Sequence, residues 1–150
     1  MPELRADVRL LYKVFYNLVL NAIQHMPSGG KITIRGAHHV NLDGLKARSE
    51  IQVTVSDTGF GIDASVQKRI FDKSFRYRAS RAAAAGSADE YAGLGLAIAE
   101  GIVRAHGGRV WVESRGRDVI LNPGSHFHVM LPAMQGTGKS STTLPIRAIL

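Results

Sequence analysis

The sequence predicts an α+β fold, a two-layer sandwich in which a mixed β-sheet is covered on one face by about three helices. Two observations predict this class. Apolar residues recur at helical spacing in some segments and alternate with polar residues in others. The predicted order is helix, strand, strand, helix, loop, helix, strand, strand, and its runs of neighbouring strands favour a sandwich, because a Rossmann fold would alternate strand and helix more strictly.

The first element is a helix predicted over residues 7–25, with Asp7 as its N-cap. Its core stripe recurs at helical spacing and consists of Leu11, Val14, Phe15, Leu18, Val19 and Ala22. The opposite face carries the polar side chains Lys13, Asn17, Asn21 and Gln24. Because the two asparagines are one helical turn apart, both point away from the core stripe. Residues 26–30 contain proline and glycine and end the helix.

Two strands follow, each indicated by alternating apolar residues. Ile32 and Ile34 mark the first strand, and residues 51–55 form the second, with Asp57 just beyond its end. Residues 38–48, between these strands, are predicted to form a polar connection.

After Asp63, Val66 and Ile70 share one face of a predicted short helix. Residues 77–92 are poor in large apolar side chains, and we expect a mobile loop there. A longer helix is predicted over residues 93–106.

The last two strands are predicted at residues 110–112 and 127–131, joined by a connection over residues 115–124. The folded domain is expected to comprise residues 1–132. Residues 133–150, rich in Gly, Ser and Thr, are expected to form a flexible C-terminal tail.

Composition limits the classes of function. The chain has 150 residues, the size of one domain, and no cysteine, which excludes disulfides and thiolate metal sites. No apolar run approaches the roughly 20 residues of a membrane-spanning helix, and no signal peptide is visible, so a soluble cytoplasmic domain is expected. The net charge of +7 favours anionic ligands such as nucleotides. Part of the basic cluster at residues 69–81 is assigned to phosphate.

Four short motifs follow one another within about eighty residues: NLVLNA at 17–22, DTGFG at 57–61, IFDKSFR at 70–76 and GLGL at 93–96. In this order they resemble the N, G1, F and G2 boxes of the ATP-binding domain of two-component sensor histidine kinases. The resemblance covers about residues 7–132, and the run that begins at Asn21 is similar to sensor kinases of the nitrogen-regulation type. It implies a Bergerat-type ATP-binding fold.

In the N box, the resemblance assigns Asn21 to Mg²⁺, a hard cation that prefers oxygen ligands. Related ATPases of the gyrase and heat-shock 90 type carry a water-activating glutamate where this chain has Asn17. An amide cannot take a proton from water, so Asn17 argues against a dedicated hydrolase and for phosphoryl transfer to another nucleophile. Gln24 and His25 extend the expected nucleotide contacts, although the family often has a lysine and an aromatic residue there.

In the G1 box, an ionised carboxylate at Asp57 accepts a hydrogen bond from the exocyclic amine of adenine, whereas guanine would present a repelling carbonyl. Gly59 and Gly61 allow the backbone to bend and approach the purine. The resemblance adds Ile62 to the nucleotide-binding residues.

The resemblance assigns Lys73 and Arg76 of the F box to the γ-phosphate, where positive charge stabilises the transferring group. The G2 box contributes the nucleotide-binding residues Gly93, Leu94, Gly95 and Leu96 at a helix N-terminus, which favours phosphate. Ser125 is expected near the adenine. Tyr91 departs from the family pattern, because it stands at the usual first glycine of the G2 box.

The resemblance implies that the chain binds Mg·ATP and donates the γ-phosphate to a histidine of a separate dimerisation and phosphoacceptor domain, which then phosphorylates a response regulator. Asn17, Lys73 and Arg76 are the catalytic candidates. That domain and the regulator are the expected partners, without nucleic acid or direct membrane contact, and this chain is expected to be monomeric. Two alternatives stay open: an ATP hydrolase or protein-serine kinase on the same fold, and a degenerate, non-catalytic nucleotide-sensing module.

Overall fold

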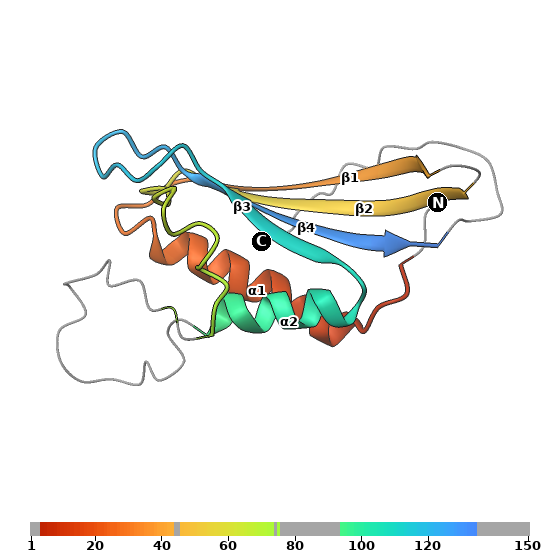
Figure 1. The fold of residues 1–150 in the computed structure, drawn as a ribbon. Helices are drawn as coiled ribbons and strands as arrows, with labels where there is room; N and C mark the ends of the chain where they lie inside the picture. The colour runs from red at the N-terminus through yellow and green to blue at the C-terminus, as the bar shows by residue number, and fades with distance from the viewer. Residues whose placement is uncertain (1–3, 44–45, 74, 76–93, 135–150) are drawn as a thin grey trace.

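The sheet has four strands in the order β1-β2-β4-β3, and both helices lie on one of its faces (Figure 1). The computed structural model describes residues 4–43, 46–73, 75 and 94–134. Its elements in chain order are α1 (Val8–Gln24), β1 (Ile32–Asp43), β2 (Lys46–Asp57), α2 (Gly95–Ala105), β3 (Arg109–Glu113) and β4 (Ser125–Ala133). This arrangement confirms the predicted α+β class.

The core lies between the sheet and the helices. Alternate residues of β4 face the helices, and Phe127, Val129 and Leu131 are at most 1% exposed. Val14 and Leu18 of α1 belong to the same cluster and are fully buried. Burying a side chain of this size contributes roughly 1.5–3 kcal/mol, so this face of α1 fixes the helix against the sheet.

The N-cap prediction for α1 is confirmed. The Asp7 carboxylate accepts hydrogen bonds from the backbone amides of Arg9 (2.9 Å) and Leu10 (3.3 Å), which have no acceptor inside the helix. The helix ends at the cap residue His25, and Gly29 then takes a positive φ of 84° that reverses the chain.

Two details of the predicted fold are corrected. Every strand pairing among the described residues is antiparallel, so the sheet is not mixed. The described residues form two helices rather than about three, because residues 64–73 form consecutive turns. The amides of Arg69 and Asp72 bond three residues back, at 2.8 and 2.9 Å, so no regular α-helical ladder develops in this segment.

The polar connection predicted at residues 38–48 is also wrong, because β1 continues to Asp43 and β2 begins at Lys46. His38 pairs with Ile51, and Asn41 pairs with Arg48. This part of the hairpin is mostly polar, and the few large apolar side chains there, such as Leu42 at 80%, are exposed rather than packed on the core.

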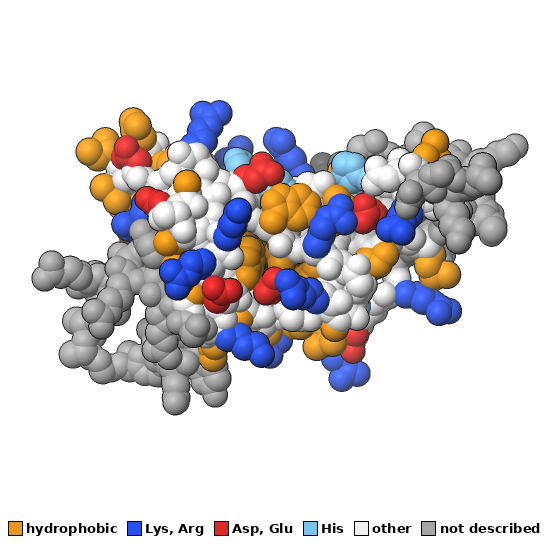
Figure 2. Space-filling model, in the orientation of Figure 1, with side chains coloured by type: hydrophobic (Ala, Val, Ile, Leu, Met, Phe, Trp, Pro, Cys, Tyr) orange, Lys and Arg blue, Asp and Glu red, His pale blue; other side chains and the backbone are white. Residues whose placement is uncertain are grey.

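Basic side chains are spread over the face seen in Figure 2 rather than gathered in one patch. Some are paired with acids, as in Arg109–Glu50 (2.9 Å) and Arg104–Glu100 (3.1 Å). Exposed pairs contribute at most about 1 kcal/mol each, so the charge acts mainly as a diffuse positive field. No helix in the described part of the chain is long and apolar enough to cross a membrane.

Candidate functional site

Asp57 is a buried carboxylate at the end of β2, 5% exposed and paired in the sheet with Ser125 of β4. The backbone amide of Gly59 donates to its Oδ1 at 2.8 Å, and the backbone amide of Ser125 also favours the charged carboxylate. Burial is the largest influence and raises the pKa of Asp57 above its ordinary value, although these two amides oppose it. The carboxylate is therefore held in place with acceptor capacity left for a ligand.

The turn after Asp57 lies against the C-terminal end of α1. The backbone amide of Phe60 donates to the carbonyl of His25 at 3.2 Å. A methyl group on Gly59 would stand 2.5 Å from the same carbonyl, so only glycine fits there. Gly61 has a φ of +73°, which favours glycine for a different reason. The two glycines predicted to shape this turn therefore do so.

The pKa of His25 is lowered, mainly because the imidazole is buried, although the charge of Asp57 acts in the opposite direction. A neutral ring consequently borders the Asp57 turn at neutral pH. Asn21 precedes His25 by one turn of α1 and is half-buried, whereas Gln24 is exposed.

Asn17 lies where α1 contacts the beginning of α2. Its Oδ1 would lie 3.3 Å from a Cβ placed on Gly95, the first residue of α2. Its Nδ2 is buried and has no hydrogen-bond partner within the described part of the chain. An unpaired buried donor is costly, and an anionic oxygen of a ligand would satisfy it. Leu94, the N-cap residue of α2, makes no side-chain cap hydrogen bond.

Asn17, Asn21 and His25 are spaced four residues apart and share one face of α1. At 1.5 Å per residue they span about 12 Å, from the first turn of α2 to the Asp57 turn. A helix N-terminus and an unpaired donor thus stand at one end of this line, and a buried carboxylate stands at the other.

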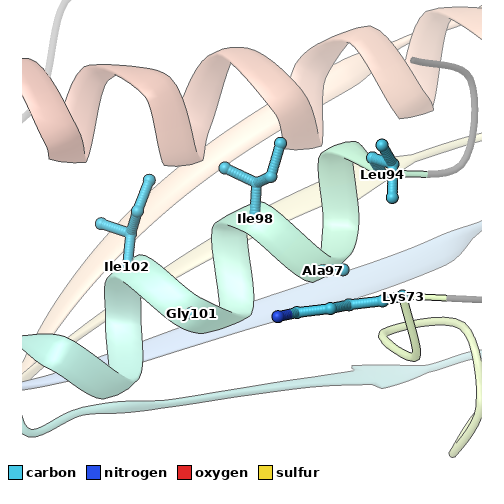
Figure 3. A pocket seen from close by; sticks show the side chains of 6 residues that line it. All are labelled: Lys73, Leu94, Ala97, Ile98, Gly101 and Ile102. Carbon is cyan, nitrogen blue, oxygen red and sulfur yellow. The ribbon is translucent and has the colours of Figure 1, made fainter. Parts of the chain in front are cut away.

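Lys73 lies along the side of α2, where it borders a cavity of about 360 Å³ with Leu94, Ala97, Ile98, Gly101 and Ile102 (Figure 3). In Figure 3 its side chain runs beside the helix, away from Leu94. The structure does not bring its ammonium to Asn17, and its contact with phosphate stays a prediction. Leu96 packs against the core. Arg76, Tyr91 and Gly93 lie outside the described residues, as do the mobile loop predicted at 77–92 and residues 135–150 of the predicted tail.

Ser125 is 3% exposed and lies beside Asp57, and its contact with adenine stays a prediction. Two residues that the sequence did not single out, Gln67 and Ser114, hold the backbone of Ile62 by hydrogen bonds. They lie 47 residues apart along the chain, and no local pattern signals their meeting. No group of three or more His, Asp or Glu side chains in the described ranges could hold a metal ion.

Comparison with known proteins gives a consistent result. The family described as histidine kinase-, DNA gyrase B-, and HSP90-like ATPase matches residues 6–135. The adaptive-response sensory kinase SasA of Rippkaea orientalis is 36% identical over 88% of this chain and 29% of its own length. SasA of Prochlorococcus marinus strain AS9601 is 35% identical over 96% of this chain and 34% of its own length. The chain therefore spans about a third of the length of these curated relatives.

Two solved structures are similar over most of the chain. A mycobacterial sensor histidine kinase, MprB, superposes with a TM-score of 0.65 at 26% identity, covering 87% of this chain and 76% of its own. The nucleotide-free catalytic domain of histidine kinase ThkA superposes with a TM-score of 0.62 at 28% identity, covering 86% and 71%.

Proposed function

This chain belongs to the family of histidine kinase-, DNA gyrase B- and HSP90-like ATPases, and from this premise we propose that it binds Mg·ATP and donates the γ-phosphate to a histidine of a separate dimerisation and phosphoacceptor domain. That domain would pass the phosphoryl group to a response regulator in the cytoplasm. Since the relatives are about three times as long as the matched region, the acceptor would belong to another part of the full-length protein.

The observation that carries the proposal is the line of Asn17, Asn21 and His25 between the first turn of α2 and the Asp57 turn. An extended nucleotide placed along this face of α1 would have its base at Asp57 and its phosphates at Asn17. The unpaired Nδ2 of Asn17 would then donate to a phosphate oxygen, and the amides at the start of α2 would favour the same charge. The chemical character of each end suits that end of the nucleotide.

The base would be selected by Asp57. An ionised carboxylate accepts the hydrogen bond that the exocyclic amine of adenine donates, and it repels the carbonyl that guanine has at the same position. The hydrogen bond from the amide of Gly59 holds the carboxylate in place, so the discrimination would need no rearrangement on binding. The neutral imidazole of His25 would border the purine.

Mg²⁺ would be held by the side-chain oxygen of Asn21 together with phosphate oxygens and water. A half-buried neutral amide beside an anion site fits a hard cation that usually keeps several waters and takes few protein ligands. Bound there, the metal would screen the triphosphate charge. Lys73 and Arg76 are the further proposed contacts to phosphate, and in the sequence both precede the mobile loop predicted at residues 77–92.

In the proposed transfer, a nitrogen lone pair of the acceptor histidine forms the bond to the γ-phosphorus. The bond to the β,γ-bridging oxygen breaks, and ADP leaves. Asn17 cannot act as the base that would activate water, because its amide does not accept a proton near neutral pH. The chain's own residues position the nucleotide, and the partner supplies the nucleophile.

The test mixes this chain with γ-labelled ATP and a separately purified phosphoacceptor domain of a sensor kinase, either unmodified or with its histidine replaced by glutamine. Label that appears only on the unmodified acceptor, is lost in acid and persists in alkali would support the proposal. Asn21→Ala is the matched negative control. Steady ATP hydrolysis without acceptor would instead indicate a hydrolase, acid-stable label a serine kinase, and nucleotide binding without turnover a sensing module.

A further inference from the structure

We propose that Ser114 and Gln67 are positioning residues for the base end of the site. They fix the backbone of Ile62, hold the Asp57–Ile62 turn against β4, and thereby set adenine affinity and selectivity. This inference rests on the proposed function, since it concerns the same nucleotide site. Neither side chain would contact the nucleotide.

Ser114 immediately follows β3, and its hydroxyl links the Asp57–Ile62 turn to the residue before β4. The backbone amide of Ile62 donates to Ser114 Oγ at 3.0 Å. The hydroxyl in turn donates to the carbonyl of Gly124 at 2.7 Å, with the carbonyl of Gly116 as a second acceptor at 3.1 Å. A serine hydroxyl has one proton and two lone pairs. It can therefore accept the hydrogen bond from Ile62 and at the same time donate one to Gly124, the residue before β4.

Gln67 holds the other side of the same peptide. Its side-chain Nε2 donates to the carbonyl of Ile62 at 3.0 Å and to the carbonyl of Ser114 at 2.9 Å. Both of its amide protons are therefore used. The backbone N–H and C=O of Ile62 are each bound by one of the two side chains, and Gln67 also fixes the position of Ser114 itself.

Three further backbone contacts close the arrangement. The amide of Gly124 donates to the carbonyl of Gly59 at 2.9 Å, and the amide of Asp118 donates to the carbonyl of Phe60 at 2.8 Å. Ser125, the residue after Gly124, pairs with Asp57 in the sheet, and its backbone amide favours the charged carboxylate. The backbone beside that carboxylate is thus coupled through Gly124 to the hydroxyl of Ser114.

Removal of the Ser114 hydroxyl leaves the amide of Ile62 without its acceptor in a part-buried place, which favours rearrangement of the turn. The perturbation lies at the base end, far from the phosphate end at Asn17. ATP, ADP and adenosine should therefore lose affinity by the same factor, about tenfold, which corresponds to the loss of one such hydrogen bond. The preference for ATP over GTP should fall, and the stimulation of binding by Mg²⁺ should not change.

The experiment is a calorimetric titration of the whole chain and its variants with ATP, ADP, adenosine and GTP. Ser114→Ala and Gln67→Leu should each give the equal loss for the three adenine ligands and the lower ATP-to-GTP ratio. Their combined effect should be smaller than the sum, because both act through Ile62. Ser49→Ala is the matched control: it removes a buried hydroxyl bonded to His38 at 2.7 Å, at the distant end of β2. It should leave all affinities unchanged.

Adenine affinity and selectivity in Ser114→Ala equal to those of the unmodified chain would overturn the inference while leaving the proposed function intact. Absence of nucleotide binding by the unmodified chain would overturn both. If the variants fail to fold, the inference is tested on the unmodified chain. There, hydrogen exchange at the Ile62 amide should slow to the same extent with adenosine as with ATP. Exchange there that adenosine does not change would also refute the inference.

Discussion

Replacement of Asp57 by asparagine separates recognition of the base from stability. The substitution keeps the shape of the side chain and an oxygen that can accept the hydrogen bond from Gly59, now 2.8 Å long. It removes the charge and places an amide donor where adenine also presents a donor. Hydrogen bonds to charged groups contribute about 1.5–3 kcal/mol, so ATP affinity should fall by about 10- to 10²-fold.

The effect on stability should be small or favourable. Burial raises the pKa of Asp57 in the folded protein above its unfolded value. The stabilisation that comes with its protonation is fully present below the unfolded pKa and is lost as pH rises through the folded pKa. At neutral pH the buried charge is therefore a cost, and a neutral amide avoids it. The melting temperature of Asp57→Asn should be unchanged or raised.

The assay pairs calorimetric ATP titration with thermal unfolding at pH 7. Asp63→Asn is the matched control, because Asp63 is exposed and its carboxylate only accepts hydrogen bonds from Ser65. The control should bind ATP normally. Survival of ATP affinity in Asp57→Asn would refute the assignment of Asp57, and a large drop in its melting temperature would refute the argument from burial.

Three other outcomes are expected. Asn21→Ala should reduce the gain in ATP affinity on adding Mg²⁺ by at least about tenfold, a loss seen even for outer-shell partners of metals; an unaltered gain in titrations would exclude Asn21 as a ligand. Phe127→Ala should lower the free energy of unfolding by about 3–5 kcal/mol in urea titrations, because Phe127 is fully buried, whereas Ile120→Ala, at a side chain 84% exposed, should have almost no effect. Burial lowers the pKa of His25 and of His128 below the ordinary 6.5, so the stability that depends on their neutral form is present above pH 6.5 and is lost as pH falls through their folded values. Urea unfolding between pH 8 and 5 should show this decline, and His128→Gln should reduce it; a slope that His128→Gln leaves unaltered would contradict the reasoning.

Local signals were sufficient for the elements that bury one face. The core stripe of α1 and its cap at Asp7 were predicted because a helix with one apolar face and a capping carboxylate leaves both marks in a short stretch of sequence. The strand at residues 51–55, which the structure extends to Lys46–Asp57, and the last strand, with Phe127 inward, were predicted for the same reason.

The errors have physical causes. The outer half of the β1–β2 hairpin is rich in polar residues, and its few large apolar side chains, Val40 and Leu42, alternate with polar residues but are exposed, so only pairing between the strands reveals it. The segment after Asp63 has the apolar spacing of a helix, but its backbone forms turns, and its side chains bind a remote loop: Gln67 donates to the carbonyls of Ile62 and Ser114. Contacts of this sequence separation leave no local signal.

The residues of the candidate site also divide into those that a local motif predicted and those that it did not. The motif order predicted Asn17, Asn21, Asp57 and the glycines, and the structure places Asn17, Asn21, Asp57, Gly59, Gly61 and Gly95 along one helix face and at its two ends. The supporting bonds of Ser114 were not predicted. The similarity to the nitrogen-regulation type of sensor kinase and the phosphate contacts of Lys73 and Arg76 stay predictions.

Binding of Mg·ATP is tested by a calorimetric titration of this chain with a non-hydrolysable ATP analogue, with and without Mg²⁺, and with GTP as the competing base. We expect saturable binding at one site that Mg²⁺ strengthens and that GTP does not match, because Asp57 selects adenine and Asn21 holds the metal. No binding, or binding that is indifferent to both base and metal, would contradict this expectation and would indicate a domain of this family that works through contacts alone.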